Sequence, residues 1–580
     1  MTYTRSLLAA TLALTLAACS QQPTVSPTAS APAVTDASAG TYLVGFRQDA
    51  LSTQSLSEQA QAIAAAGGVV TSQWADISAA AVKLTPGALA KLKTNPVVEY
   101  VEQEAVHHAL GGKHVTTDAT AAGKPGSVTP ASTTAAPYTP SGEYTWGDNA
   151  LRVPALRAAG YTGAATTKVG VCVLDTGIDG NHPEFQHKLN GFKNFVTAET
   201  NRGSAYQLND VSHHGTHVSG TIYAQYGAGT GAAGLQPGED ANGVGGVASG
   251  ADLYMGRVLG DTGSGSSAGI INGLNWCVAQ LKSQGGTEDK VIVSMSLGGG
   301  SRSTTEQRAY TSAYNKGVLI IAATGNDGAA VSYPAAYTQV VGVAAVDNTL
   351  AKASFSNFGT EVDLSGPGVS VLSSVPLGAG AAATASGGGV TFTGVSGADK
   401  SAQTTFTGTI VKAGDGTGTA GNNEFCGTST RNPALSGNIA LISRGTCTFE
   451  EKVANASASG AKAVMVYNNA AGVLGMSLTN TYAIPVVGIQ QTDGQTLLTK
   501  LPTTGTVAVT TADYEYFDGT SMATPHVSAA AAVVWAALPT LTNTQLLSKL
   551  TGTARDLGAA GRDNNFGYGL VDPYRAITGQ

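Results

Sequence analysis

The chain has 580 residues, a length at which more than one domain is expected. Its formal net charge of −7 gives no electrostatic reason to expect a nucleic-acid partner. Charged residues make up only 12% of the chain while glycine occurs 75 times, which favours strands, tight turns and small-residue packing over long solvated helices, and the hydrophobic content of 42% is enough for sizeable cores.

The N-terminus has the features of an export signal. Arg5 precedes an apolar run from Leu7 to Ala17, which is too short to span a bilayer. The small residues before Cys19 resemble the bacterial lipobox, in which the cysteine is lipidated and becomes the new N-terminus; ordinary signal cleavage beside an incidental cysteine is the alternative. We expect residues 1–19 to be a lipoprotein-type signal peptide, and the protein to be secreted or held at a bacterial cell surface through Cys19.

Three segments follow before the largest domain. Residues 20–40 are rich in Pro, Ser, Thr and Ala and are predicted to be a flexible tether. Residues 41–108 carry strand and helix signals in the order strand–helix–strand–strand–helix–strand, which predicts a small α+β domain. Residues 109–143 return to Thr, Ala, Pro and Gly and are predicted to be a linker.

In residues 144–375 strands and helices alternate, which argues for a parallel α/β sheet. Polar side chains stand at three of the junctions. Asp175 ends a buried-strand pattern, His214 opens an apolar run, and Asn326 follows another apolar strand. Ligands and catalytic groups gather at the carboxyl ends of strands in such sheets, so we expect these side chains to lie near one another.

The alternating pattern is then interrupted. Residues 376–514 shift to Gly, Ala and Thr with short strands, and they contain no candidate catalytic set. The pattern resumes over residues 515–580, where a small-residue turn places Ser521 at the start of an apolar helix.

An aspartate, a histidine and a serine form a recognised catalytic combination. A serine hydroxyl is a weak nucleophile at neutral pH and needs a base within hydrogen-bond reach. Histidine suits that role because its pKa lies near the operating pH, and a carboxylate on its other ring nitrogen fixes the tautomer.

The chain order Asp, His, Ser, with about eight matching residues around each, resembles the subtilisin-like serine proteases. The resemblance implies that Ser521 is the nucleophile, His214 the general base and acid, and Asp175 the orienting carboxylate. It assigns no catalytic role to His213 or His217, which flank the base.

The resemblance also implies how substrate is bound. Asn326, which alone would be an ordinary turn residue after a strand, would donate to the oxyanion together with the backbone N–H of the serine. Two further segments would bind the peptide backbone and line the primary pocket. They are Ser296, Leu297 and Gly298, and Ala323, Thr324 and Gly325.

Resemblance covers nearly all of the chain outside its linkers. Residues 41–108 resemble the inhibitory propeptide of subtilases, which assists folding and plugs the cleft until it is removed; an unrelated α+β domain is the alternative. Residues 376–514 resemble the protease-associated (PA) domain, with a role in substrate access or recognition or as an inert spacer. The expected fold is α/β: a subtilisin-like parallel sheet with helices on both faces, preceded by the propeptide domain and interrupted by a mostly β insertion.

The remaining cysteines and a possible ion complete the expectations. Cys426 and Cys447 lie in one module and are expected to pair. Cys172 and Cys277 are expected to be two buried free thiols, and a bridge between them is the alternative. The loop from Glu239 to Ala248 resembles a shortened calcium loop of the family, and a solvated glycine-rich turn explains it equally well. The chemistry itself needs no cofactor.

We therefore expect a secreted subtilisin-like serine endopeptidase that acts through an acyl-enzyme and is made as an autoprocessed zymogen. Its partners would be protein and peptide substrates and its own propeptide, and it would be a monomer without nucleic acid. A processing protease with few substrates is one alternative. An inactive or weakly active surface-binding lipoprotein, using residues 376–514 as its working surface, is the other.

Overall fold

The computed structural model describes most of the chain from residue 39 onward. The described residues are 39–48, 55–113, 138, 140–185, 188–196, 199, 202–227, 243–392, 394–398, 400–416, 421–469, 474, 476, 478 and 480–580. The expected signal peptide, Cys19 and most of the tether lie outside them. Within these residues no helix is both long and apolar enough to cross a membrane.

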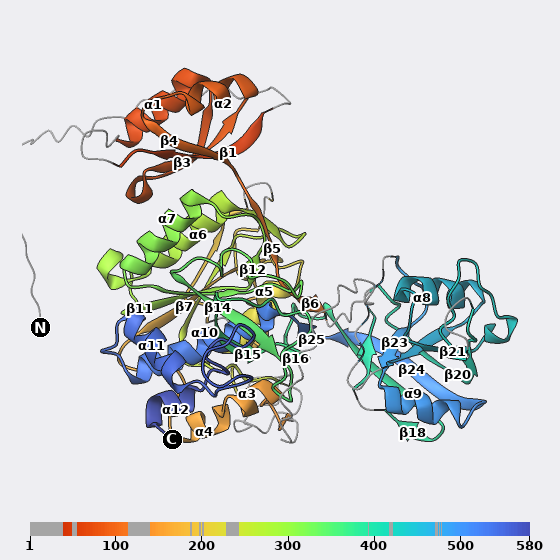
Figure 1. The fold of residues 1–580 in the computed structure, drawn as a ribbon. Coiled ribbons are helices and arrows are strands. Elements are labelled where there is room, and N and C mark those ends of the chain that lie inside the picture. The colour runs from red at the N-terminus through yellow and green to blue at the C-terminus, as the bar shows by residue number, and fades with distance from the viewer. Residues whose placement is uncertain are drawn as a thin grey trace, which may run out of the picture.

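The N-terminal domain is an antiparallel four-stranded sheet with two helices on one face, shown red to orange at the top of Figure 1. In chain order its elements are β1 (Gly40–Phe46), α1 (Leu56–Ala66), β2 (Val69–Trp74), β3 (Ala79–Leu84), α2 (Pro86–Lys93) and β4 (Val98–Gln103). This is the order that the sequence predicted. Helix α1 begins with a capping box between Ser55 and Glu58 and ends at Gly67, whose φ of 91° suits glycine.

The central domain is built on a seven-stranded parallel sheet in the order β15-β14-β13-β11-β7-β9-β8. Its strands are β7 (Val169–Asp175), β8 (Gly191–Asn194), β9 (Asp252–Arg257), β11 (Lys290–Met295), β13 (Leu319–Ala323), β14 (Val340–Val346) and β15 (Val362–Pro367). Strand β7 is buried along its whole length, as a continuous apolar run in a parallel sheet requires.

Helices cover both faces of this sheet. One face carries α5 (His214–Tyr223) and α10 (Thr520–Ala537), and the other carries α6 (Ser267–Val278) and α7 (Thr304–Asn315). The remaining helices are α3 (Trp146–Ala150), α4 (Val153–Ala158), α11 (Asn543–Thr553) and α12 (Pro573–Thr578). Side chains of β7 alternate between the two cores, with Val171 and Val173 facing α10 and Leu174 facing α6. The architecture is the subtilisin-like α/β fold that the sequence predicted.

The insertion is a separate body at the right of Figure 1 with a mixed eight-stranded sheet. In sheet order its strands are β18 (Val390–Thr391), β17 (Gly380–Gly387), β24 (Thr503–Ala512), β20 (Thr405–Lys412), β21 (Ile439–Ser443), β22 (Ala463–Tyr467), β23 (Val486–Ile489) and β19 (Ser396–Gly397). Helix α8 (Phe449–Ala458) packs on one face and α9 (Gln491–Leu498) on the other.

The two ends of the insertion lie side by side. Strand β16 (Val371–Ser374) leads into it and β25 (Tyr514–Asp518) leads out, and the two pair as antiparallel neighbours. The N–H of Val375 donates to the carbonyl of Asp513 at 2.8 Å. The inserted domain therefore leaves and rejoins the central domain through one two-stranded stem.

Two disulfides are present among the described residues. Cys426 is bonded to Cys447 within the insertion. Cys172 on β7 is bonded to Cys277 on α6, so our expectation of two free thiols was wrong. Helix α6 packs directly on β7, which brings the two Cα atoms to 5.7 Å, within the range that a disulfide spans.

Candidate functional site

Asp175 and His214 meet at the carboxyl edge of the sheet. Asp175 is the last residue of β7, and its Oδ1 lies 2.7 Å from Nδ1 of His214, the first residue of α5. Both side chains are buried. Because a carboxylate only accepts, Nδ1 donates, and in the neutral ring Nε2 then carries the lone pair. Nε2 has no hydrogen-bond partner among the described residues, so it is available as a base.

A second set of bonds fixes the distance between β7 and α5. Thr176 donates to Asp210 at 2.8 Å and accepts from the N–H of Gly215, and Asp210 also accepts from Thr216. Burial raises the pKa of Asp210 to about 6 despite these donors. Gly215 must be glycine, because a Cβ there would lie 2.1 Å from the carbonyl oxygen of Gly177.

The two histidines that flank His214 in the sequence are His213 and His217. His217 stacks on Phe517 with ring centroids 4.2 Å apart, and its Nε2 contacts the carbonyl oxygens of Val371 and Glu515. Burial lowers the pKa of His217 to about 3, so the ring is neutral. His213 has a φ of 67° and precedes α5.

Ser521 is the second residue of α10, whose N-cap is Gly519. Its hydroxyl donates to the carbonyl oxygen of Ser296 at 2.8 Å rather than to His214. The side chain of Asn326 is turned so that Oδ1 accepts from the N–H and hydroxyl of Thr520, both at 2.9 Å. Its Nδ2 is thereby directed away from Thr520, toward the space beside Gly519.

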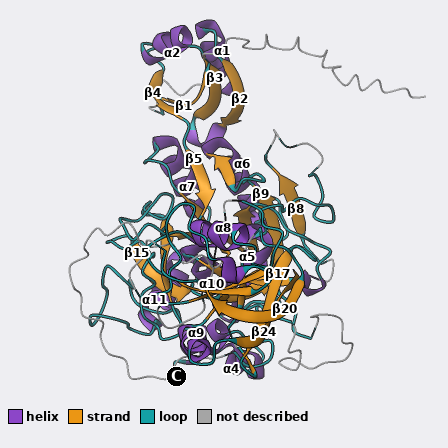
Figure 2. Ribbon diagram, turned by 90° about the vertical axis from the view of Figure 1, so that its right-hand side faces the viewer, coloured by secondary structure: helices purple, strands orange, loops and turns teal. Residues whose placement is uncertain are grey.

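A segment of the chain itself occupies the space in front of Ser521. After β4 the chain runs down into the central domain as β5 (Val106–Ala109), visible between the two domains in Figures 1 and 2. Strand β5 pairs antiparallel with β10 (Ser264–Ser266) on one side and β12 (Leu297–Gly298) on the other. Residues 109–113, which composition predicted to be the start of a linker, are described by the structure and continue from this strand.

Leu110 brings its carbonyl group to the serine. Its N–H donates to the carbonyl of Ser296 at 3.1 Å, and its carbonyl oxygen accepts from the N–H of Ser521 at 3.0 Å. A Cβ on Gly519 would lie 2.6 Å from the Leu110 oxygen and 3.2 Å from Nδ2 of Asn326. Both expected oxyanion donors therefore flank one carbonyl group of the chain.

The two expected substrate-binding segments are placed differently by the structure. Ser296 to Gly298 bind β5 through the backbone, and a Cβ on Gly298 would lie 2.5 Å from Cδ1 of Leu110. The segment Ala323 to Gly325 follows β13 and contacts the serine helix, where the N–H of Gly325 donates to the hydroxyl of Thr520 at 3.2 Å.

The residues that follow Leu110 also pair with a strand of the central domain. Strand β6 (Gly112–Lys113) pairs antiparallel with β25, with Gly112 opposite Asp518 and Lys113 opposite Phe517. The strand that returns from the insertion therefore lies against the residues that follow Leu110.

Sequence reasoning missed this segment because its composition is that of a linker. The available signal was the strand-like run from Val106 to Leu110, directly after a small α+β domain.

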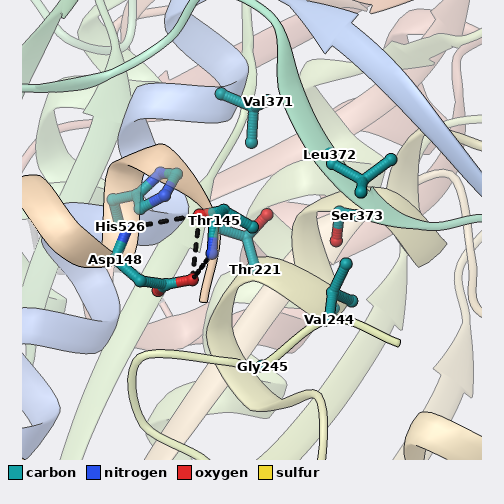
Figure 3. Close-up of a pocket in the computed structure, with 10 residues that line it drawn as sticks. Thr145, Asp148, Thr221, Val244, Gly245, Val371, Leu372, Ser373 and His526 are labelled. Atoms are coloured by element: carbon teal, nitrogen blue, oxygen red, sulfur yellow. Dashed lines mark hydrogen bonds between the residues drawn. The ribbon is translucent and has the colours of Figure 1, made fainter. Parts of the chain in front are cut away.

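A pocket behind α5 lies apart from these groups (Figure 3). Asp148 there accepts from the N–H and hydroxyl of Thr145, both at 2.8 Å, beside the ring of His526. Burial raises the pKa of Asp148 to about 7 and lowers that of His526 to about 4. The pocket contains none of Asp175, His214 and Ser521, because the cleft in front of Ser521 is filled by the chain.

A calcium site was one of the expectations from the sequence. No cluster of three or more His, Cys, Asp or Glu side chains in the described part of the chain could hold a metal ion. Asp240 and Asn242, the hard-oxygen candidates of the expected calcium loop, lie outside the described residues.

Comparisons with known proteins agree with this fold. The profile of the subtilase family matches residues 166–444, and that of the PA domain matches residues 406–497. Subtilisin NAT from Bacillus subtilis subsp. natto is 35% identical over 342 residues, which cover 58% of this chain and 74% of that protein. Alkaline elastase YaB from Bacillus sp. (strain YaB) is 32% identical over 346 residues, with the same two shares.

Among solved structures, the psychrophilic subtilisin-like protease Apa1 from the Antarctic psychrotroph Pseudoalteromonas sp. AS-11 superposes with a TM-score of 0.55 at 30% identity. The match covers 75% of this chain and 97% of that one. Parallel sheet, inserted PA domain and sequence identity together show that the chain belongs to the subtilase family of serine proteases.

Proposed function

We propose that the chain is a serine endopeptidase made as a zymogen, and that it first cleaves its own bond between Leu110 and Gly111. The observation that carries this proposal is the Leu110 carbonyl group, which accepts from the N–H of Ser521 while the residues before it pair as a strand with the cleft.

The reaction follows from the same atoms. The Ser521 hydroxyl leaves the carbonyl of Ser296, gives its proton to Nε2 of His214 and forms a bond to the carbonyl carbon of Leu110. The negative charge that develops on the Leu110 oxygen is stabilised by the N–H of Ser521 and by Nδ2 of Asn326.

Collapse of the tetrahedral intermediate breaks the C–N bond. His214, now protonated and held by Asp175, gives the proton to the departing amine of Gly111, and an ester remains between Leu110 and Ser521. Water activated by His214 then hydrolyses the ester and restores the free serine. Protein and peptide substrates would follow the same course once residues 39–110 have left the cleft.

Export and anchoring belong to the same proposal. A lipid on Cys19 would stay with the N-terminal fragment after the cut, so the protease portion would be released. Labelling cells with a radioactive fatty acid tests this: the label should appear in the wild-type chain and be absent from Cys19→Ala. Label in neither chain would leave ordinary signal cleavage as the export route.

The first test follows the mass of the full chain and of Ser521→Ala over time. We expect the wild type alone to yield a fragment that begins at Gly111, and Ser528→Ala, which removes another buried serine of α10, to behave like the wild type. If wild-type and Ser521→Ala chains both stay intact and the wild type does not digest unfolded protein, the surface-binding lipoprotein becomes the better description.

A further inference from the structure

A buried pair of polar side chains lies where the N-terminal segment enters the cleft. Nε2 of His107, on β5, lies 2.7 Å from Oε1 of Glu306, on α7, and neither side chain is exposed to solvent. Counted from the proposed cut, Leu110 is the first residue on the upstream side and His107 the fourth. Glu306 therefore lies at the base of the fourth upstream subsite.

The subsite is built by the protease portion of the chain. Glu306 also accepts from the hydroxyl of Ser267 at 2.5 Å and from that of Tyr337 at 3.0 Å. Its position in the first turn of the 12-residue helix α7, behind the N-cap Ser303, adds the favourable end of the helix dipole. These partners remain when the N-terminal fragment leaves.

The carboxylate is ionised in this setting. Burial alone raises the pKa of Glu306, but the charge and hydrogen bond of His107, with the bonds from Ser267 and Tyr337, bring it below its usual value. Because a carboxylate accepts only, His107 donates from Nε2, and Nδ1 has no hydrogen-bond partner among the described residues.

The space around the imidazole is restricted. A Cβ on Gly300 would make an ordinary contact with Cε1 of His107 at 3.7 Å and a tight one with Cβ of Ala105 at 3.1 Å, so the segment passes close to Gly300. By contrast His108, the third residue upstream, is exposed, and its Nδ1 lies 2.9 Å from the hydroxyl of Ser264.

A buried pair of this kind is weak evidence of added stability, because apolar side chains of similar volume usually stabilise a fold as well or better. The clear effect of this pair is on which substrate side chains the subsite accepts. Once the fragment leaves, Glu306 has lost one donor, and a substrate that supplies none leaves a buried carboxylate short of a hydrogen bond.

We propose that Glu306 is a specificity-determining residue that makes this protease select a histidine, or a side chain of similar size ending in a nitrogen donor, at the fourth position before the cleaved bond. This rests on the proposed function, since it numbers positions from the Leu110–Gly111 bond. Apolar side chains are accepted poorly there, and carboxylates are rejected because two negative charges would share one buried site.

The test compares peptides X-His-Ala-Leu, each with a fluorescent leaving group after Leu, where X is His, Leu or Glu. The enzyme is the full chain after self-processing. We expect kcat/KM for His to exceed that for Leu by about 10- to 100-fold, the range for a hydrogen bond to a charged group, with Glu lower still. Replacing His by Leu at the exposed third position should change kcat/KM only a few-fold.

Glu306→Gln keeps an acceptor but removes the charge, so we expect the preference for His over Leu to fall to a few-fold and the Glu peptide to improve. Glu361→Gln, which removes an exposed carboxylate elsewhere, should leave the preference unchanged. The peptide series on the wild type tests the preference for His at the fourth position even if Glu306→Gln does not fold.

Equal cleavage of all three peptides, or a preference for Leu, overturns this inference and leaves the proposed function standing. If the wild type cleaves no peptide and stays uncut itself, the proposed function fails and this inference with it.

Discussion

Glu102 offers the sharpest test of the proposed inhibition by the N-terminal domain. Its carboxylate accepts from the hydroxyl of Ser303 at 2.6 Å and from the N–H groups of Thr304 and Thr305, both at 2.9 Å. These groups form the N-terminus of α7, where unpaired N–H groups and the helix dipole favour a negative charge. Glu104 does the same at α6, accepting from Ala268 at 2.9 Å.

The size of the effect follows from these contacts. A hydrogen bond to a charged group contributes about 1.5–3 kcal/mol, and a carboxylate at a helix N-terminus about 0.3–1 kcal/mol. The three bonds share one carboxylate, and water replaces part of them after Glu102→Ala. We therefore expect a loss of about 2–4 kcal/mol, which weakens binding of the cleaved fragment by about 30- to 800-fold.

The assay measures the delay between self-cleavage, followed by mass, and the appearance of peptide hydrolysis. Most of the weakening should appear in the rate of dissociation, so Glu102→Ala should shorten the delay by a similar factor. Glu58→Gln is the matched control, because Glu58 caps α1 within the N-terminal domain and glutamine preserves a capping box. A delay unchanged in Glu102→Ala would show that the helix ends contribute little to inhibition.

Four further outcomes can be checked. Asn326→Ala should lower the rate of self-cleavage and kcat by about 10²–10³-fold, a magnitude established on subtilisin, with KM little changed. Replacing Cys172 and Cys277 by alanine opens a loop with a sequence separation of 105, so the free energy of unfolding should fall by about 5 kcal/mol and the thermal midpoint should fall with it. A smaller fall would mean that packing between the strand and the helix, rather than the disulfide, supplies most of the stability there. In an inactive background, Asp148 should contribute a loss of roughly 4 kcal/mol of stability as pH rises from about 4 to 7, because burial raises its pKa to about 7 and the folded state retains a proton that the unfolded state releases. The lowered pKa values of His217 and His526 act in the opposite direction, so the Asp148 contribution is measured as the difference between the unfolding curves of the wild type and Asp148→Asn. Replacing residues 377–512 by a short glycine turn should keep kcat/KM for short peptides within about tenfold, and complete loss would mean that the insertion supports the site itself.

The candidate catalytic groups could be located from sequence because each stands at the end of a regular element. A buried apolar run ends at Asp175, and His214 and Ser521 each begin a helix, so local pattern and chain order were sufficient. The order of elements in the N-terminal domain was predictable for the same reason. In both cases the information is local in the chain.

The missed features depend on pairs of groups far apart in the chain. Residues 105–110 bind the cleft mainly through the backbone, and backbone hydrogen bonding leaves no side-chain pattern in a sequence. Glu306 has the sequence surroundings of a solvent-facing helix residue, yet its side chain is buried among Ser267, Tyr337 and His107. Whether Cys172 and Cys277 form a bond depends on the distance between a strand and a helix. Knowing that the two elements are neighbours in the family fold does not give that distance.

The strand in the cleft also has a consequence for where and when the protease is free. While residues 39–110 are covalently attached, their concentration at the cleft is of the order of millimolar, however dilute the protein is. Once Leu110 is separated from Gly111, the same contacts depend on how many fragments surround each enzyme. Dilution into a large volume would then release activity, whereas crowding at the site of synthesis would suppress it. A fragment kept at the membrane by its lipid, with the protease diffusing away, would make that release directional.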